Sequence, residues 1–222
     1  MSHQPEQLLS RIPNELHELA GEVSPERLKR CLDLLDNRLN GIIVAAEAVH
    51  RRHNVSAILR SAEAFGIHEA HLIAHRFKAS KGAARGSERW LDLQLFPDTP
   101  SWASHVKQRG FRVYIADLSD DAISPEELPV ESPIAVLFGG ELAGVSDEAR
   151  AIADGVVTIP MRGVTQSLNV SVAAAVVTWT IAQRRREVPG AHGVEEQHRA
   201  PFVKRFLERE VARRKVAKVW LR

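Results

Sequence analysis

Three segments of this 222-residue chain concentrate polar side chains beside glycine or proline, and each comes close to an apolar run that predicts a β-strand. They cover residues 53–60, 138–146 and 159–171. Strands that alternate with helices form parallel sheets, and ligands of such sheets bind at the carboxyl ends of the strands. We therefore expect the three segments to form one ligand site at that edge.

Residues 53–60 carry Asn54 near a predicted helix start and Arg60 six positions later. Six positions correspond to 600° at about 100° per residue, so the two side chains lie about 120° apart around the helix. They could converge only on a group above the helix N-terminus, unless Arg60 reaches along its flank. A helix cap at Asn54 and a surface charge at Arg60 are the alternative interpretation.

Residues 138–146 place Gly139 and Gly140 directly after a predicted strand, where backbone N–H groups can approach a ligand closely. The spacing matches neither the dinucleotide fingerprint nor the P-loop. A plain turn is the alternative.

In residues 159–171, Ser167, Asn169 and Ser171 crowd the expected start of an apolar helix. A helix needs only one of them as its N-cap, so the excess favours a ligand or a second backbone segment there.

Two periodicities alternate along the elements that must position these residues. Strands are predicted at 41–49, 70–74, 90–96, 111–118, 134–138 and 156–161, and helices at 53–65, 101–108, 146–153 and 167–186. This alternation favours a parallel α/β sheet covered by helices on both faces. The sheet and its helices are predicted to form one domain over residues 41–186. Residues 1–40 are predicted to form a helical N-terminal extension of this domain, and residues 187–222 a basic helical C-terminal extension.

Composition excludes several classes of protein. The single cysteine, Cys31, rules out a disulfide framework and any multi-cysteine metal site. The ten histidines are scattered without ligand spacing, so we expect no metal. No apolar run reaches the 18 residues of a membrane span and no secretory signal opens the chain, so the expected location is cytoplasmic.

Residues 183–222 hold 12 Lys and Arg against 5 Asp and Glu, which suggests a polyanionic partner or a solvated basic tail.

The motifs "HNVSAILRSAEAFGIHEAH", "VLFGGELAGVSDEA" and "ADGVVTIPMRGVTQSLNVSVAAAVV" together resemble those of the SpoU–TrmH branch of RNA ribose 2′-O-methyltransferases, within the SPOUT superfamily. The likeness runs from about residue 41 to residue 186. It implies a parallel α/β domain with a deep C-terminal trefoil knot, S-adenosylmethionine bent within the knot, and a homodimer formed through the knot region. Such a knot is an exception to ordinary chain topology.

The resemblance also implies roles for individual residues. Arg60 matches the essential arginine of the family, and Asn54, Glu141, Ser167 and Asn169 match its other polar motif residues. Because a guanidinium is not readily deprotonated, we expect Arg60 to grip the phosphate beside the target ribose. The cofactor would be held mostly by backbone groups around Ala116, Gly139, Ile159, Met161 and Leu168.

RNA contacts are expected from arginines in and around the motifs. These are Arg27, Arg30, Arg38, Arg51, Arg52, Arg89, Arg184 and Arg186. The favoured substrate is guanosine 18 in the D-loop of tRNA. Leu142, Arg162 and Thr165 depart from the usual motifs and weaken this assignment. The alternatives are another tRNA position or ribosomal RNA, a non-catalytic RNA-binding protein on the same fold, and an unrelated small-molecule enzyme.

Overall fold

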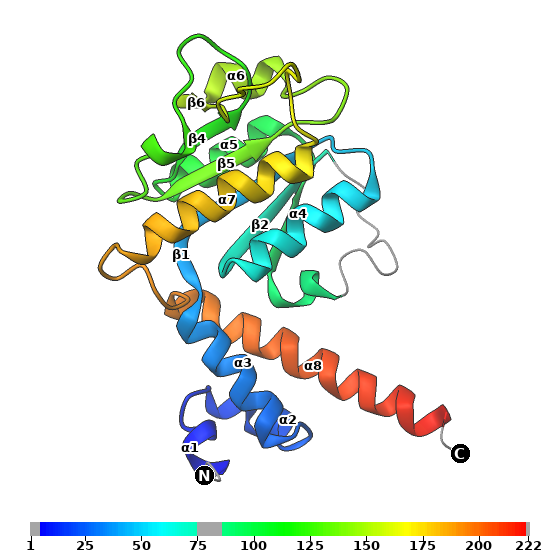
Figure 1. The fold of residues 1–222 in the computed structure, drawn as a ribbon. Helices are drawn as coiled ribbons and strands as arrows, with labels where there is room; N and C mark the ends of the chain where they lie inside the picture. The colour runs from blue at the N-terminus through cyan, green and yellow to red at the C-terminus, as the bar shows by residue number, and fades with distance from the viewer. Residues whose placement is uncertain (1–4, 75–85, 221–222) are drawn as a thin grey trace. The chain divides into compact units, whose positions relative to one another are not determined.

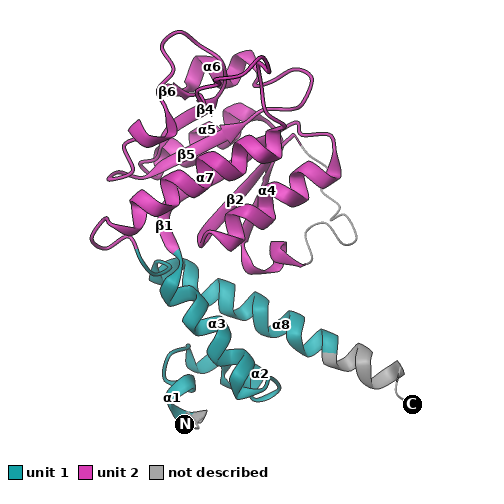
Figure 2. Ribbon diagram, in the orientation of Figure 1, with its two compact units in different colours: residues 1–38, 192–222 teal, residues 39–191 magenta. Residues whose placement is uncertain are grey.

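The computed structural model describes residues 5–74 and 86–220, and it divides the chain into two compact units. One unit comprises residues 39–191, and the other joins residues 1–38 to residues 192–222 (Figure 2). The two ends of the chain, predicted above as separate extensions, therefore belong to one helical unit. No helix of the described residues is both long enough and apolar enough to cross a membrane.

The larger unit is built on a six-stranded sheet in which every pair of neighbouring strands is parallel. The strand order is β3-β2-β1-β5-β4-β6. The strands are β1 (Leu39–Glu47), β2 (Ile67–Ile73), β3 (Asp92–Phe96), β4 (Arg112–Ala116), β5 (Ile134–Phe138) and β6 (Gly155–Val157). The predicted parallel sheet is confirmed.

Helices cover both faces of this sheet (Figure 1). Alternate residues of β1 point to opposite sides, as the two-residue repeat of a strand requires. One side packs against α4 (Arg52–Ala64) and α7 (Val170–Arg186), and the other against α5 (Thr99–Gln108) and α6 (Asp147–Ile152). Short 3₁₀ turns at Ser87–Trp90 and Pro125–Glu127 complete the described part of this unit.

Three predicted elements beside the site need correction. The strand predicted at 111–118 ends at Ala116, and Asp117 and Leu118 line the pocket described below. The strand predicted at 156–161 ends at Val157, so residues 158–161 lie outside the sheet. Pro160 has no N–H and could not donate to a hydrogen-bond ladder between strands. The helix predicted from Ser167 begins only at Val170. The corrections at β6 and α7 lengthen the loop between them, which lines the same pocket.

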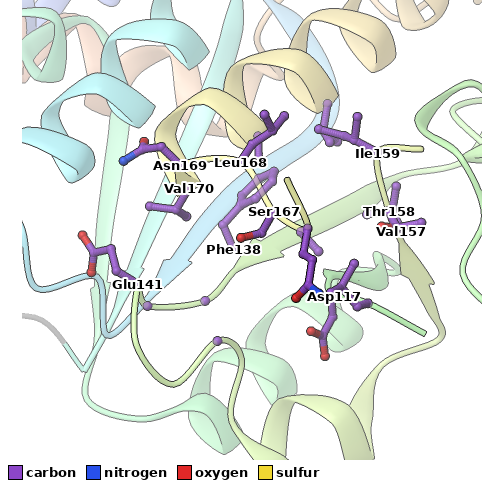
Figure 3. A pocket seen from close by; sticks show the side chains of 18 of the residues that line it. Asp117, Phe138, Glu141, Val157, Thr158, Ile159, Ser167, Leu168, Asn169 and Val170 are labelled. Carbon is purple, nitrogen blue, oxygen red and sulfur yellow. The ribbon is translucent and has the colours of Figure 1, made fainter. Parts of the chain in front are cut away.

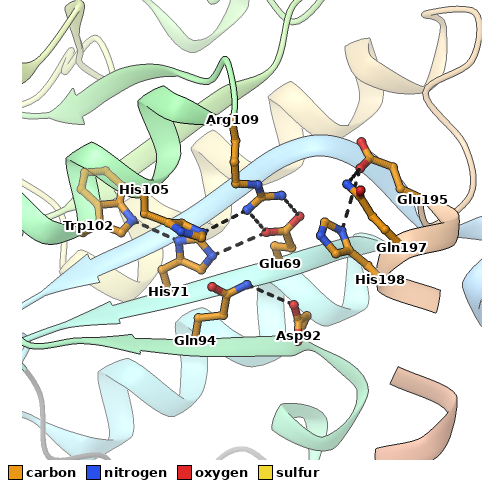
Figure 4. Close-up of polar contacts among 10 residues, drawn as sticks. All are labelled: Glu69, His71, Asp92, Gln94, Trp102, His105, Arg109, Glu195, Gln197 and His198. Carbon is orange, nitrogen blue, oxygen red and sulfur yellow. Dashed lines mark hydrogen bonds and ion pairs between the residues drawn. The ribbon is translucent and has the colours of Figure 1, made fainter. Parts of the chain in front are cut away.

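A buried polar cluster joins β2 to α5 (Figure 4). The Arg109 guanidinium donates two hydrogen bonds to the Glu69 carboxylate, at 2.7 and 2.8 Å, and the Trp102 indole N–H donates to His71 Nδ1 at 3.0 Å. Burial alone would raise the pKa of Glu69, but the two hydrogen bonds and the positive charge of Arg109 outweigh it and lower that pKa. Glu69 therefore stays ionised and fastens α5 to the sheet.

The helical unit comprises α1 (Pro5–Leu9), a 3₁₀ turn at Asn14–Leu16, α2 (His17–Gly21), α3 (Pro25–Asn37) and α8 (Glu196–Trp220). Helices α2 and α3 both contact α8, so the start and the end of the chain share an apolar core. Ion pairs from Arg27 to Glu210 at 2.6 Å and from Arg199 to Asp36 at 2.7 Å reinforce the contact between α3 and α8.

Candidate active site

The loops that follow β4, β5 and β6 enclose a pocket of about 470 Å³ together with the segment that enters α7 (Figure 3). Its volume lies within the range of small-molecule and cofactor sites. It lies at the carboxyl ends of the strands, as the three polar segments predict. All five residues expected to surround a cofactor line it: Ala116, Gly139, Ile159, Met161 and Leu168.

The glycine loop after β5 folds tightly on itself and forms one wall of the pocket. A Cβ atom on Gly139 would overlap the backbone of Gly144, and one on Gly140 would lie 2.6 Å from the carbonyl oxygen of Ala48. The Gly144 N–H closes the loop by donating to the Gly140 carbonyl at 3.0 Å. The glycines therefore let parts of the protein's own backbone come together, a use of glycine that the sequence alone did not reveal.

Glu141 projects from this loop and holds the start of α4. Its carboxylate accepts hydrogen bonds from Asn54 Nδ2 at 2.6 Å and from the backbone N–H groups of His50 and Arg51 at 3.2 and 3.3 Å. Partial burial raises the pKa of Glu141, but these hydrogen bonds outweigh the effect and lower it. An acid without a partner nearby in sequence thus finds one 87 positions away.

Asn54 and Asn169 are joined directly. Asn169 Nδ2 donates to Asn54 Oδ1 at 3.3 Å, and Asn169 Oδ1 accepts from the Ser171 N–H at 2.9 Å, which makes Asn169 the N-cap of α7. Asn54 is buried within α4 and does not cap that helix, because the residue at the cap position is Arg51. The interpretation of Asn54 as a simple helix cap is therefore wrong.

Ser167 also lines the pocket, in the loop just before α7. The structure thus brings together four of the five residues expected to take part in catalysis: Asn54, Glu141, Ser167 and Asn169. Arg60 is the exception. It lies on the exposed side of α4, outside the lining of the pocket, and no hydrogen bond or ion pair joins it to the described part of the chain.

The arginines expected to contact RNA occupy different environments. Exposed side chains are those of Arg27, Arg30, Arg51, Arg52 and Arg89. Arg38 is only 1% exposed, which removes it from any RNA-facing surface of this structure. Arg184 donates to the backbone carbonyls of Pro125 and Leu128, and Arg186 donates to that of Phe65. These two arginines therefore already hold the protein's own loops.

Some pocket residues were not singled out from the sequence. Asp117, Thr158 and Gln166 line the pocket as well. Asp117 forms an ion pair with Arg150, and it directly follows the last residue of β4. The strand predicted at 111–118 placed Asp117 inside the sheet, which hid its position at the carboxyl end of β4. The described residues contain no cluster of three or more His, Cys, Asp or Glu side chains able to hold a metal ion.

Comparison with known proteins identifies the family of this domain. Residues 41–179 match the family model described as the SpoU rRNA Methylase family. The chain belongs to the SpoU methylase family. The matched region contains most of β1, all of β2 to β6 and more than half of α7, and it includes every residue that lines the pocket.

Individual relatives are similar over most of their length. A tRNA (guanosine(18)-2′-O)-methyltransferase of Thermus thermophilus is 43% identical over 176 residues, which cover 77% of this chain and 89% of the relative. The crystal structure of the A. aeolicus TrmH/SpoU tRNA modifying enzyme superposes with a TM-score of 0.74 at 33% identity, covering 84% of this chain and 97% of that one.

A third relative was crystallised with its cofactor. The SpoU methyltransferase AviRb from Streptomyces viridochromogenes, in complex with AdoMet, is 26% identical with a TM-score of 0.61. The match covers 70% of this chain and 64% of AviRb. S-adenosylmethionine is therefore bound within this family.

Proposed function

We propose that this protein transfers a methyl group from S-adenosylmethionine to the ribose 2′-hydroxyl of guanosine 18 in tRNA. The identity of 43% with the Thermus thermophilus enzyme over 176 residues carries the proposal, together with a family match at residues 41–179 that includes the whole pocket. A tRNA substrate also implies a cytoplasmic location. The departures at Leu142, Arg162 and Thr165 leave Asn54, Glu141 and Asn169 in place.

The pocket has the size and the chemistry for S-adenosylmethionine. The glycine wall admits no side-chain atom at Gly139, and the chain around Ala116, Ile159, Met161 and Leu168 offers backbone groups to a ligand. When bound, S-adenosylmethionine supplies an electrophilic methyl group. We further propose that the chain around this pocket forms the trefoil knot of the family.

The polar side chains of the site position the RNA rather than take its proton. Glu141 already accepts three hydrogen bonds, and the amides of Asn54 and Asn169 are not bases. The exposed guanidinium of Arg60 is available to grip a phosphate with two parallel hydrogen bonds. The phosphate or a water molecule would then accept the proton of the 2′-hydroxyl.

A homodimer would cover an apolar stripe on α7. Val172, Val176 and Trp179 share one side of this helix and are 47%, 39% and 51% exposed. A second copy of the same helix fits this stripe, because a two-fold interface pairs a surface with itself. Sedimentation velocity should give a dimer. Val176→Glu should give a monomer, whereas Arg112→Glu, at the amino end of β4, should not.

The function is tested with labelled S-adenosylmethionine and an unmodified tRNA transcript, followed by nuclease digestion and mass spectrometry. We expect 2′-O-methylguanosine at position 18, and no transfer to a transcript in which guanosine 18 is replaced. Transfer at another nucleotide would overturn the assignment of guanosine 18. Absence of methyl transfer to both tRNA and ribosomal RNA would overturn the proposed methyltransferase activity and favour a non-catalytic RNA-binding protein.

The role of Arg60 needs a separate test, because Arg60→Lys keeps the charge but loses the planar fork. We expect this variant to lose most of its turnover. The matched control is Arg112→Lys, an exposed arginine at the opposite edge of the sheet. Near-normal turnover of Arg60→Lys would refute the two-point contact with phosphate.

A further inference from the structure

A buried carboxylate, Glu47, lies directly behind the glycine loop. It is the last residue of β1 and only 4% exposed, within a run of otherwise apolar residues. The proposed chemistry does not use it, and it does not line the pocket. A charged group is costly to bury unless it is hydrogen-bonded, so its partners indicate what it does.

The partners of Glu47 come from two helix starts. One carboxylate oxygen accepts the backbone N–H of Ser146 at 2.8 Å, and the other accepts the Ser146 hydroxyl at 2.7 Å. The Thr99 hydroxyl, at the first residue of α5, donates to the carboxylate as well. The Ser146 hydroxyl also accepts the Ala149 N–H and so caps α6.

Ser146 is the anchor at the far end of the glycine loop. The loop leaves β5 at Phe138 and reaches Ser146 immediately after the buried Val145. Between them it supplies Gly139, Gly140, Glu141, Leu142 and Gly144 to the wall of the pocket. Holding both the backbone and the hydroxyl of Ser146 fixes where the loop ends. The position of Glu141, and through it that of Asn54, depends on the course of the loop.

The other side of Glu47 is strained. Ala48 has a φ of +49°, in the left-handed region that costs a residue with a Cβ about 1–2 kcal/mol. Its carbonyl oxygen lies where a side chain on Gly140 would be, so the turn after β1 packs directly against the glycine loop. Strain of this kind persists only where the surrounding structure enforces it, and it gathers at functional sites.

We propose that Glu47 is a positioning residue that locks the glycine loop in the shape required to bind S-adenosylmethionine. It acts through Ser146 on one side and through the turn at Ala48 on the other. The proposal rests on the proposed function, since the ligand of the pocket is taken from it. The contact to Thr99 serves a different purpose, because it secures α5, which does not line the pocket.

This division of partners provides a matched control. Glu47→Ala removes every contact to Ser146 and Thr99, whereas Thr99→Val removes only the contact to α5. Both variants should lower the melting temperature. Only Glu47→Ala should weaken binding of S-adenosylhomocysteine in calorimetry, by about tenfold or more, a change expected from the loss of charged hydrogen bonds. Measurements should be made well below the melting temperature of each variant.

Kinetics and a conservative variant supply the second readout. The KM for S-adenosylmethionine should rise more than the KM for tRNA in Glu47→Ala, because the glycine loop lines the cofactor pocket directly and reaches the RNA only through Glu141 and Asn54. Glu47→Gln should recover part of the affinity, because its carbonyl can accept the Ser146 N–H while its amide donates to a hydroxyl. Equal loss of affinity in Glu47→Ala and Thr99→Val, or no loss in either, would overturn the proposal. Failure of the unaltered protein to bind the ligand would instead overturn the proposed function.

Discussion

The hydrogen bond between Glu141 and Asn54 can be weakened with little change of shape by Glu141→Gln. A glutamine oxygen in place of Oε1 can still accept Asn54 and Arg51, but without the negative charge that strengthens these hydrogen bonds, and the NH₂ group in place of Oε2 then faces the His50 N–H donor. We expect the fold to survive and Asn54 to be held less firmly in its orientation. The methyl transfer rate should therefore fall while the protein remains folded.

The size of the effect follows from the geometry. Hydrogen bonds to charged groups contribute about 1.5–3 kcal/mol, and the 2.6 Å contact to Asn54 is the strongest of the three at Glu141. The backbone contacts at 3.2 and 3.3 Å are long and contribute less. Because Glu141 is partly exposed to solvent, we expect a loss of about 1–2 kcal/mol. That corresponds to a fall of roughly 5–30-fold in kcat/KM.

The assay is methyl transfer from tritiated S-adenosylmethionine to a tRNA transcript, with thermal unfolding as a check on the fold. Glu148→Gln is the matched control, because Glu148 is an exposed glutamate on α6 that bonds to none of the described residues. The double variant Asn54→Asp with Glu141→Gln restores a carboxylate–amide pair in reverse and should recover part of the rate. A kcat/KM within twofold of normal in Glu141→Gln would refute the positioning of Asn54 by Glu141.

Three further predictions concern single residues. Ala48→Gly should relieve the positive φ and stabilise the protein by about 1 kcal/mol, seen as a rise of about 2–4 °C in melting temperature; an unchanged or lower value would contradict the strain. Gly139→Ala should weaken S-adenosylhomocysteine binding by more than about tenfold in calorimetry, since the methyl group collides with Gly144; normal affinity would show that the loop adapts freely. Burial raises the pKa of the Cys31 thiol to about 12, so the reactive thiolate is scarce at pH 8. An aromatic disulfide reagent should then label Cys31 only after unfolding in urea, and rapid labelling of the native protein would refute this.

Hydrophobic periodicity predicted the sheet well because five of the six strands are short apolar or alternating runs bounded by turn residues. It failed at residues 158–161, where an apolar sequence next to Pro160 lines the pocket instead of extending β6. It also placed the start of α7 three residues too early, because Ser167 and Leu168 belong to the wall of the pocket. In both places, residues that line the pocket are of the same types as those of the adjoining strand or helix.

The contacts within the site lay beyond the reach of the sequence for a different reason. The types of Asn54, Glu141 and Asn169 marked them as candidates, but their partners are 87 and 115 positions apart. Only the packing of α4 against α7 and the turn of the glycine loop bring them together. Burial of Arg38 was equally invisible, because arginine is mostly exposed in proteins and nothing local marks an exception.

The row formed by Asn169, Asn54 and Glu141 has a direction. Asn169 Oδ1 accepts both the N–H and the hydroxyl of Ser171, so the capping of α7 fixes which way the Asn169 amide faces. Its NH₂ group must then point to Asn54, whose own NH₂ group points to Glu141. The remaining N–H of Asn169 can only donate. Any ligand group that meets this amide inside the pocket must therefore present an oxygen or another hydrogen-bond acceptor. The capping of α7 thus decides that the pocket accepts an acceptor atom, and not a donor, at this point.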